Sequence, residues 1–354
     1  MSAVDGPRET AIPDALGPVA DLAGILTDDG RPAWLVLSGN GALRRWIPDR
    51  ADVETITVLP LPKPEPDAGD RLCHRLHVSR CGRFAAVVED YGNRGAVLDL
   101  SRGGAVTMEL SGGDYHEDVV PFSLLFAEHE GAAVMVHRTA WNRLDVSDPA
   151  TGRLLTPRES PDPEHGDAPH YLDYFHGALY PSPDGTRIYD DGWVWQPLGV
   201  PAVWSLTAWM RDDPFESEDG ASRTDYAFLE EWGRGVAWIR ADRIAVFDSG
   251  DGGQPPCVRV LDPTQLSSSP YVTSQVMKTV TTFPGPDGRY FTDRHGDAAA
   301  LLLASAETGL EAWDIDAGSK TFELPGFRPD RQHQHTLELI ELGDRVVRCW
   351  QPRA

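Results

Sequence analysis

The sequence predicts an all-β fold, a seven-bladed β-propeller in which four-stranded antiparallel sheets surround a central channel. Three observations predict it: a hydrophobic content that allows a large core, short apolar runs bounded by turn residues, and one motif that recurs along the chain. The 354 residues include 34 glycines and 29 prolines, and 41% are hydrophobic. Helical periodicity is hard to find. Instead, nearly continuous apolar runs of the kind that suit strands covered on both faces occur at 32–39, 83–90, 132–138, 243–250 and 299–306.

A second apolar run follows each of these and ends in an anchor, which is a tryptophan or a leucine and is often followed by aspartate. The anchors are Trp46, Leu98-Asp99, Leu144-Asp145, Trp195, Leu261-Asp262, Trp313-Asp314 and Trp350. Most follow one another at about 50 residues, near the period of roughly 40 to 50 residues of a four-stranded blade. Seven anchors predict seven blades, with six or eight as alternatives. We expect the four anchor tryptophans to pack between blades, because a single thin sheet cannot bury both of its faces.

Turn residues form a second repeated signal. Short segments that end in Gly, three of which also contain Asp, occur at 27–30, 79–82, 128–131, 182–185 and 285–288. Aspartate can bond its own backbone and glycine accepts a positive φ, so both suit tight turns. We interpret these segments as the hairpins that leave the innermost strand of each blade.

With these anchors and turns, the chain resembles a divergent bacterial β-propeller of the WD40 and TolB-like families over most of residues 20–354. Asp99, Asp145, Asp262 and Asp314 match the aspartate of the WD dipeptide, although only Trp313-Asp314 is a literal Trp-Asp and the Gly-His dipeptide of WD40 repeats is missing. The resemblance implies one propeller domain over residues 20–354. It also implies that residues 1–19 contribute a strand that closes the ring against residues near 336–352. Insertions rich in proline and acids, at 61–70, 160–169 and 211–225, are expected to be solvated loops.

The charge and the cysteines limit the partners and the compartment. The formal net charge is −23, from 55 acidic and 32 basic residues, which makes nucleic acid and anionic membranes poor partners. The first residues lack the pattern of a secretory signal, and no apolar stretch is long enough to span a bilayer, so we expect a cytoplasmic protein. The four cysteines form no CxxC pair and are expected to be free thiols.

Histidines are the most suggestive polar residues. His74, His176 and His335 each lie at a similar distance before a turn glycine, which predicts positions near the start of innermost strands, where the blades converge on the axis. There, imidazoles could hold a divalent ion with an open position for water, or could simply line a wet channel mouth without metal. No cofactor is predicted, and a divalent metal is the alternative, with His74, His176 and His335 as its ligands. The candidate ligand-binding residues are His116, His170, Asp173, His176, Asp293, Arg294, His295 and His335.

An aromatic-rich zone offers a second candidate surface. Residues 170–180 contain three tyrosines and a phenylalanine, and they are followed by Trp193, Trp195, Trp204, Trp209 and Trp232. Exposed aromatic rings anchor partners or ligands, whereas buried ones fill cores. Both interpretations of this zone stay open at this point.

The sequence contains no GxSxG, GxGxxG or P-loop motif. We therefore expect a non-catalytic recognition or scaffold module that binds a protein or a small ligand at one mouth of the channel. The alternative is an enzyme, a lyase or a hydrolase that uses the converging histidines with or without a metal. Replacing His176 or His335 by Ala is expected to abolish turnover in the enzyme and to leave the recognition module folded and competent.

Overall fold

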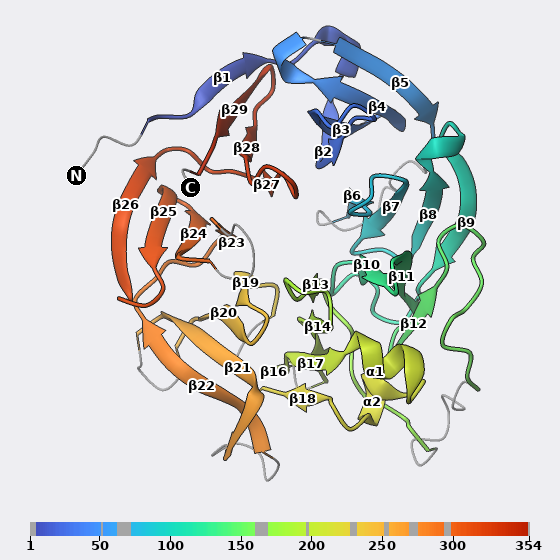
Figure 1. The fold of residues 1–354 in the computed structure, drawn as a ribbon, viewed down its shortest axis with the longest axis vertical. Coiled ribbons are helices and arrows are strands. Elements are labelled where there is room, and N and C mark those ends of the chain that lie inside the picture. The colour runs from blue at the N-terminus through green and yellow to red at the C-terminus, as the bar shows by residue number, and fades with distance from the viewer. Residues whose placement is uncertain are drawn as a thin grey trace.

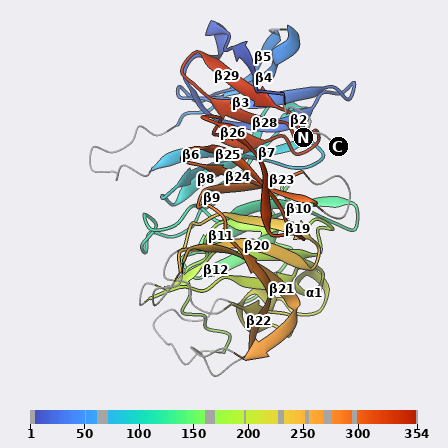
Figure 2. The same ribbon diagram turned by 90° about the vertical axis from the view of Figure 1, so that its left-hand side faces the viewer.

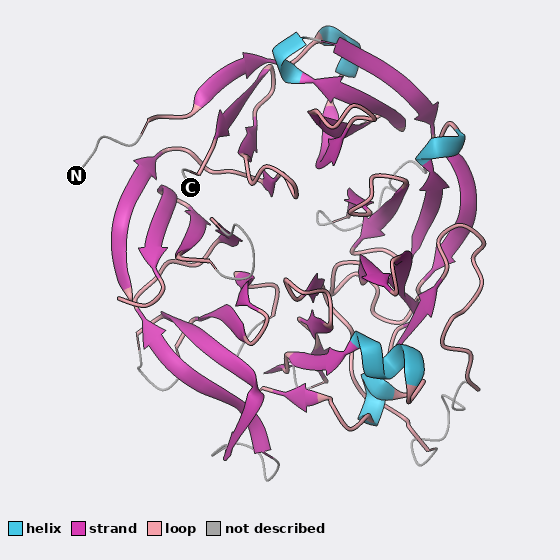
Figure 3. Cartoon of the chain, in the orientation of Figure 1, coloured by secondary structure: helices cyan, strands magenta, loops and turns pink. Residues whose placement is uncertain are grey.

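Seven blades surround a central channel in the computed structural model, which confirms the predicted fold class (Figure 1). The structure describes residues 5–50, 52–61, 72–159, 169–195, 198–226, 232–250, 255–268, 275–293 and 299–352. Strands make up nearly all of its regular elements (Figure 3). The first blade holds β2 (Val19–Leu26), β3 (Pro32–Ser38), β4 (Ala42–Ile47) and β5 (Asp52–Val58). The second holds β6 (Cys73–Val78), β7 (Phe84–Asp90), β8 (Arg94–Asp99) and β9 (Ala105–Ser111). The third holds β10 (Leu124–His129), β11 (Ala132–Ala140) and β12 (Arg143–Ser147).

The remaining blades follow the same antiparallel order from the channel outward. The fourth blade holds β13 (Leu179–Pro181), β14 (Arg187–Asp190), β17 (Ala202–Ser205) and β18 (Thr224–Asp225), and the fifth holds β19 (Val236–Arg240), β20 (Arg243–Asp248), β21 (Cys257–Ser268) and β22 (Gln275–Phe283). The sixth holds β23 (Arg289–Thr292), β24 (Leu301–Ala306), β25 (Gly309–Asp314) and β26 (Ser319–Pro325). The seventh holds β27 (Arg331–Gln332), β28 (Leu339–Leu342), β29 (Val346–Trp350) and β1 (Arg8–Ala11). The described residues also contain the 3-10 turns η1 (Asp14–Leu16), η2 (Pro48–Arg50) and η3 (Leu100–Arg102). In the third blade, a single bridge from Ser147 to Leu154 takes the place of a regular fourth strand.

The apolar runs alternate between two inter-blade cores, which explains why they are nearly continuous. In β3, Trp34 and Val36 face the seventh blade, whereas Ala33, Leu35 and Leu37 face the second. Seven such clusters, one for each pair of neighbouring blades, hold the described ring together. Each blade therefore buries both faces only because it has neighbours on both sides.

The N-terminal segment joins the last blade to the first. Strand β1 pairs antiparallel with β29, from Arg8 opposite Cys349 to Ala11 opposite Val346. The chain then enters η1, where Leu16 is fully buried and its carbonyl accepts a hydrogen bond from the Ser38 hydroxyl at 2.5 Å. Figure 1 shows β1 beside β29 at the outer edge of the ring.

Two of the anchor aspartates, Asp99 at the end of β8 and Asp262 at a register shift within β21, close local turns. Asp99 accepts a hydrogen bond from the Ser101 N–H at 3.0 Å, and Asp262 accepts one from the Thr264 N–H at 2.8 Å. An arginine near the start of the second strand pairs with each of them, Arg83 with Asp99 and Arg243 with Asp262. An arginine thus supports the aspartate in blades that lack the Gly-His dipeptide.

The fourth blade departs from the predicted pattern. Trp195 is not the anchor of a third strand and does not pack between blades, because it lies in the turn of an inserted hairpin, β15 (Trp193–Val194) and β16 (Leu198–Gly199), and is 57% exposed. The third strand is β17, which carries the buried Trp204. Its final residue, Ser205, occupies the anchor aspartate's place and caps a helix through a hydrogen bond from the Ala208 N–H.

Two further predictions are wrong. Segment 285–288 joins β22 to β23 and so precedes an innermost strand instead of leaving one. Segment 211–225 is not a plain solvated loop. It contains the end of α1 (Leu206–Arg211), all of α2 (Glu216–Asp219) and β18, and it buries Glu216, Ser217 and Glu218. The predicted insertions at 61–70 and 160–169 lie almost wholly outside the described residues.

The ring has two faces, which Figure 2 shows from the side. We call one the connector face, because it carries the segments that link consecutive blades, such as 112–123 and 284–288. The other, the turn face, carries the hairpins between first and second strands, such as 27–31 and 79–83. None of the four cysteines, all of which the structure describes, forms a disulfide, as predicted. Among the described residues, no helix has the length and apolar character needed to cross a membrane.

Candidate functional site

The connector face carries an aromatic stack over the third, fourth and fifth blades. We use this name for Tyr115, Phe175, Trp193 and Trp232, whose rings lie nearly parallel with successive centroid distances of 5.9, 4.3 and 4.8 Å. Each ring comes from a different connection of this face. Backbone hydrogen bonds between Phe175 and Trp193 fix the centre of the stack. Each ring pair of this kind stabilises the folded state by about 0.5 to 1.5 kcal/mol beyond the burial of its apolar area. The stack therefore helps to hold three blades together.

A pocket of about 400 Å³ opens beside this stack. It is lined by Tyr115, Trp141, Tyr171, Asp173, Phe175 and Trp195, a set that we call the aromatic pocket. Trp195 and Tyr115 are 57% and 52% exposed, so two of its rings face solvent. Large exposed aromatic side chains around a concavity are typical of a binding site.

His116 lies at the edge of the aromatic pocket. Its φ of 52° falls in the left-handed region that residues other than glycine rarely adopt. Its ring lies 4.9 Å from that of Trp195 and 4.5 Å from that of Tyr115. Two of the predicted ligand-binding residues, His116 and Asp173, are therefore brought to one site.

Asp191 fixes the connection that carries Trp232. Its carboxylate is 4% exposed and accepts a hydrogen bond from the Gly233 N–H at 2.7 Å. Burial, with a smaller contribution from the nearby Asp190, raises the pKa of Asp191 to about 7, while the Gly233 N–H opposes this shift. This buried carboxyl therefore holds in place the backbone next to Trp232.

The channel mouth on the same face is a cleft of about 900 Å³. Four of its five lining arginines pair with acids, among them Arg331 with Asp21 at 2.7 Å and Arg289 with Asp330 at 2.5 Å. Burial also lowers the pKa of His77 in this cleft to about 3. The Arg331–Asp21 and Arg289–Asp330 pairs connect neighbouring blades. Because the paired charges neutralise each other, the cleft offers a charged ligand fewer unpaired side chains than its composition suggests.

The other predicted ligand-binding residues that the structure describes do not line the aromatic pocket. His170 stacks on Phe215 at 3.8 Å and pairs with Asp219, against the outer helix α2. Asp293 accepts hydrogen bonds from the N–H groups of Ala300 and Leu301. Arg294 and His295 lie outside the described residues.

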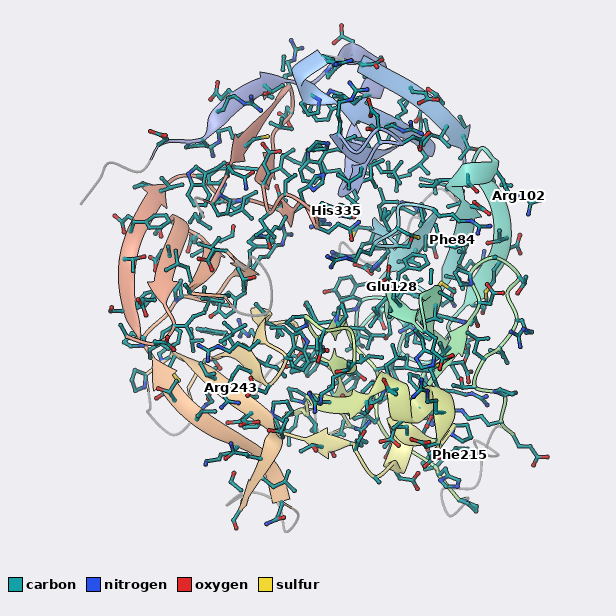
Figure 4. All side chains as sticks on the ribbon, in the orientation of Figure 1. Phe84, Arg102, Glu128, Phe215, Arg243 and His335 are labelled. Atoms are coloured by element: carbon teal, nitrogen blue, oxygen red, sulfur yellow. The ribbon has the colours of Figure 1, made fainter. Side chains whose placement is uncertain are left out.

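The three predicted metal ligands occupy separate places. His74 lies at the start of β6, opposite Glu89 on β7. His335 lies in the hairpin after β27, on the turn face, with its ring 5.8 Å from that of His333, so it does not lie at the start of an innermost strand as predicted. Figure 4 places His335 near the centre of the ring and Phe215 at its outer edge. Among the described residues, no three His, Cys, Asp or Glu side chains are grouped so that they could hold a metal ion.

Comparison with solved structures supports the fold at low sequence identity. No family model matches the chain, and no curated protein matches it. A chain in the crystal structure of a mitotic checkpoint complex aligns with a TM-score of 0.55 and 12% identity, covering 100% of this chain and 98% of that chain. The β-propeller domain of Cps50 (Swd1) from Myceliophteria thermophila aligns with a TM-score of 0.56 and 12% identity, covering 98% of this chain and 100% of that domain. The chain has a WD40-like β-propeller fold. The bacterial and TolB-like parts of the expected resemblance stay predictions.

His176 is part of the core of this propeller. It has no exposed surface, and its Nδ1 lies 2.6 Å from the Asp190 carboxylate. We predict that His176→Ala lowers the free energy of unfolding by roughly 2 to 4 kcal/mol, because it leaves a cavity and a buried carboxyl without its partner. Urea unfolding checks this, with His335→Ala as a control expected to stay within about 1 kcal/mol of the unmodified protein, since that side chain is only partly buried. Equal stability of the two variants would contradict the prediction. Loss of activity on removing His176 therefore does not distinguish an enzyme from a recognition module.

Proposed function

We propose that this propeller is a non-catalytic recognition module that binds a protein partner on its connector face, with the aromatic pocket as the anchor point. The observation that carries the proposal is the gathering of aromatic rings from several connections around one open concavity. Binding energy in protein interfaces is concentrated in a few aromatic or arginine side chains that fill such places. A cytoplasmic location, and a partner other than nucleic acid or membrane, are part of the proposal.

The two similar structures support this proposal. One of them is a chain within a mitotic checkpoint complex, so a propeller of this shape can be part of a protein assembly. Propellers present wide loop-covered faces on a rigid ring, which suits partner binding. The pairing of charges across the channel mouth favours the aromatic pocket over the channel as the anchor point.

The enzyme alternative needs catalytic histidines that share an accessible site. His176 has no exposed surface, and His335 lies in a hairpin of the turn face. These placements favour recognition over turnover. His116, at the edge of the aromatic pocket, acts in this proposal as a contact residue.

Replacing two exposed rings tests the proposed function. The double variant Tyr115→Ala, Trp195→Ala is expected to bind the partner purified from the native host at least tenfold more weakly, because two anchor rings are lost. Its free energy of unfolding should fall by no more than about 2 kcal/mol, since both side chains are more than half exposed and only Tyr115 belongs to the aromatic stack. Binding is measured by calorimetry or surface plasmon resonance, and folding by urea unfolding.

Leu266→Ala provides the matched control. Leu266 is an apolar residue on β21 that is 50% exposed and lies outside the aromatic pocket. Partner binding should survive this substitution unchanged. If the double variant bound as tightly as the unmodified protein, or if Leu266→Ala weakened binding equally, the connector face would not be the recognition surface.

A further inference from the structure

The lining of the aromatic pocket indicates what chemistry it binds. Five of its six lining residues are aromatic, and the sixth is the carboxylate of Asp173. The rings approach from several directions: Trp141 is tilted by 59° from Tyr115 and by 42° from Phe175, and Trp195 is tilted by 39° from Phe175. A group inside the pocket therefore meets ring faces on more than one side.

The charged residue that lines the pocket is an acid. None of its lining residues is lysine or arginine, and Asp173 is exposed at its edge. The adjoining connection from 112 to 123 adds Asp114 and Asp118, both exposed, and Glu117, which is half-buried. His116 is the basic side chain that contacts these rings. The potential at the pocket is therefore expected to attract cations.

Ring faces and a carboxylate together select one class of cation. The faces of Trp, Tyr and Phe carry the negative side of the ring quadrupole and attract a cation held over them. A compact, strongly hydrated ammonium loses much solvation on entering such a site, whereas an alkylated ammonium presents apolar methyl groups to the rings and keeps its charge. A neutral apolar group would gain the ring contacts but nothing from Asp173.

From this geometry we propose that the aromatic pocket binds an alkylated ammonium group, such as a methylated lysine side chain of a partner protein or a free choline-like molecule. The inference rests on the proposed function, because it names the chemical class that the anchor point recognises. Trp195 and Tyr115 supply the exposed rings, the remaining rings form the walls, and Asp173 neutralises the charge at the opening.

A pair of isosteres tests the role of charge. Choline and 3,3-dimethylbutan-1-ol share one shape, but only choline is charged. We expect choline to bind at least about tenfold more tightly than the alcohol, measured by calorimetry or by the shifts of tryptophan indole N–H signals in NMR spectra. A short peptide containing trimethyl-lysine, compared with the same peptide unmethylated, should show a preference of similar size for the methylated form.

Two substitutions locate the binding. Trp195→Ala should weaken choline binding by about tenfold or more, and Trp195→Phe should restore part of it, because a smaller ring face remains. Asp173→Asn, at an exposed position, should weaken choline binding several-fold and leave binding of the neutral alcohol unchanged. Leu266→Ala serves again as the unaffected control.

The outcomes separate this inference from the proposed function. If choline, the methylated peptide or both bind, and if Trp195→Ala abolishes that binding, the proposed recognition of an alkylated ammonium group is supported. Which of the two ligands binds then identifies the source of that group. Equal binding of the charged and neutral isosteres, or binding that persists in Trp195→Ala, overturns the inference. Absence of choline and peptide binding also overturns it, while the partner test with Tyr115→Ala, Trp195→Ala still decides the proposed function by itself.

Discussion

Deleting residues 1–17 is expected to lower the free energy of unfolding by at least roughly 4 kcal/mol, a large fraction of the 5 to 15 kcal/mol typical of a folded domain. The deletion removes β1, which pairs with β29 in the seventh blade. It also removes Leu16, which is fully buried between the seventh and first blades. The carbonyl of Leu16 would no longer accept the hydrogen bonds of Ser38 and Arg44. Urea unfolding followed by tryptophan fluorescence measures the loss.

A deletion limited to residues 1–4 is the control for this experiment, because it leaves β1 and η1 intact. We expect this shorter deletion to have little effect. If the longer deletion were equally harmless, the ring would not depend on the N-terminal strand for its closure.

Replacing Asp191 by Asn is expected to stabilise the protein by roughly 2 to 4 kcal/mol at pH 8, because the substitution removes a buried charge. Burial raises the pKa of this carboxyl from 3.8 to about 7. An asparagine oxygen can still accept the hydrogen bond of the Gly233 N–H. The free energy of unfolding is measured for both proteins between pH 4 and pH 8.

The direction of this pH dependence follows from the pH range in which the folded and the unfolded protein each keep the proton of Asp191. Above about pH 4 the unfolded chain releases the proton of Asp191, whereas the folded protein keeps it up to about pH 7. The stability contributed by this group therefore falls as the pH rises through that interval and is constant above it. The advantage of Asp191→Asn should be absent near pH 4 and fully developed by pH 8. Asp316→Asn is the matched control, since its side chain is 86% exposed, and parallel pH profiles for the unmodified protein and Asp191→Asn would contradict the account.

The ring itself could be predicted because each blade repeats the same local pattern. A run such as 32–39 alternates between two buried faces, and an anchor such as Leu98-Asp99 ends a third strand. Both signals are local, so the sequence carries them without knowledge of distant contacts. The placement of 285–288 was wrong because a turn that precedes a strand and one that leaves a strand use the same residues.

The fourth blade shows where the pattern stops being informative. Trp195 and Trp204 lie only a few residues apart, and the residues around each tryptophan do not distinguish an inserted hairpin from a third strand. The signal that distinguishes them is Ser205, a good N-cap residue followed by a helical run from Leu206 to Arg211.

The aromatic pocket could be predicted only in part. His116, Asp173 and the aromatic-rich zone around 170–180 could be selected from the sequence, and Phe175, Trp193, Trp195 and Trp232 gather on one face. Tyr115 and Trp141 were missed because each is a lone ring in its own connection. Only the packing of consecutive blades against one another brings these connections together. The three predicted metal ligands each precede a turn glycine by a similar number of residues, but they lie at different positions in the ring: His74, His176 and His335. The distance to a turn glycine does not determine which hairpin of the blade that glycine closes.

Hydrogen–deuterium exchange of the protein with and without its bound partner tests the central claim most directly. The account predicts slower exchange in connector-face segments around the aromatic pocket, namely 112–123, 141–142, 171–175 and 191–195, and unchanged exchange in the hairpins 27–31 and 79–83 of the opposite face. Protection confined to those hairpins, or to the outer helices α1 and α2, would contradict it.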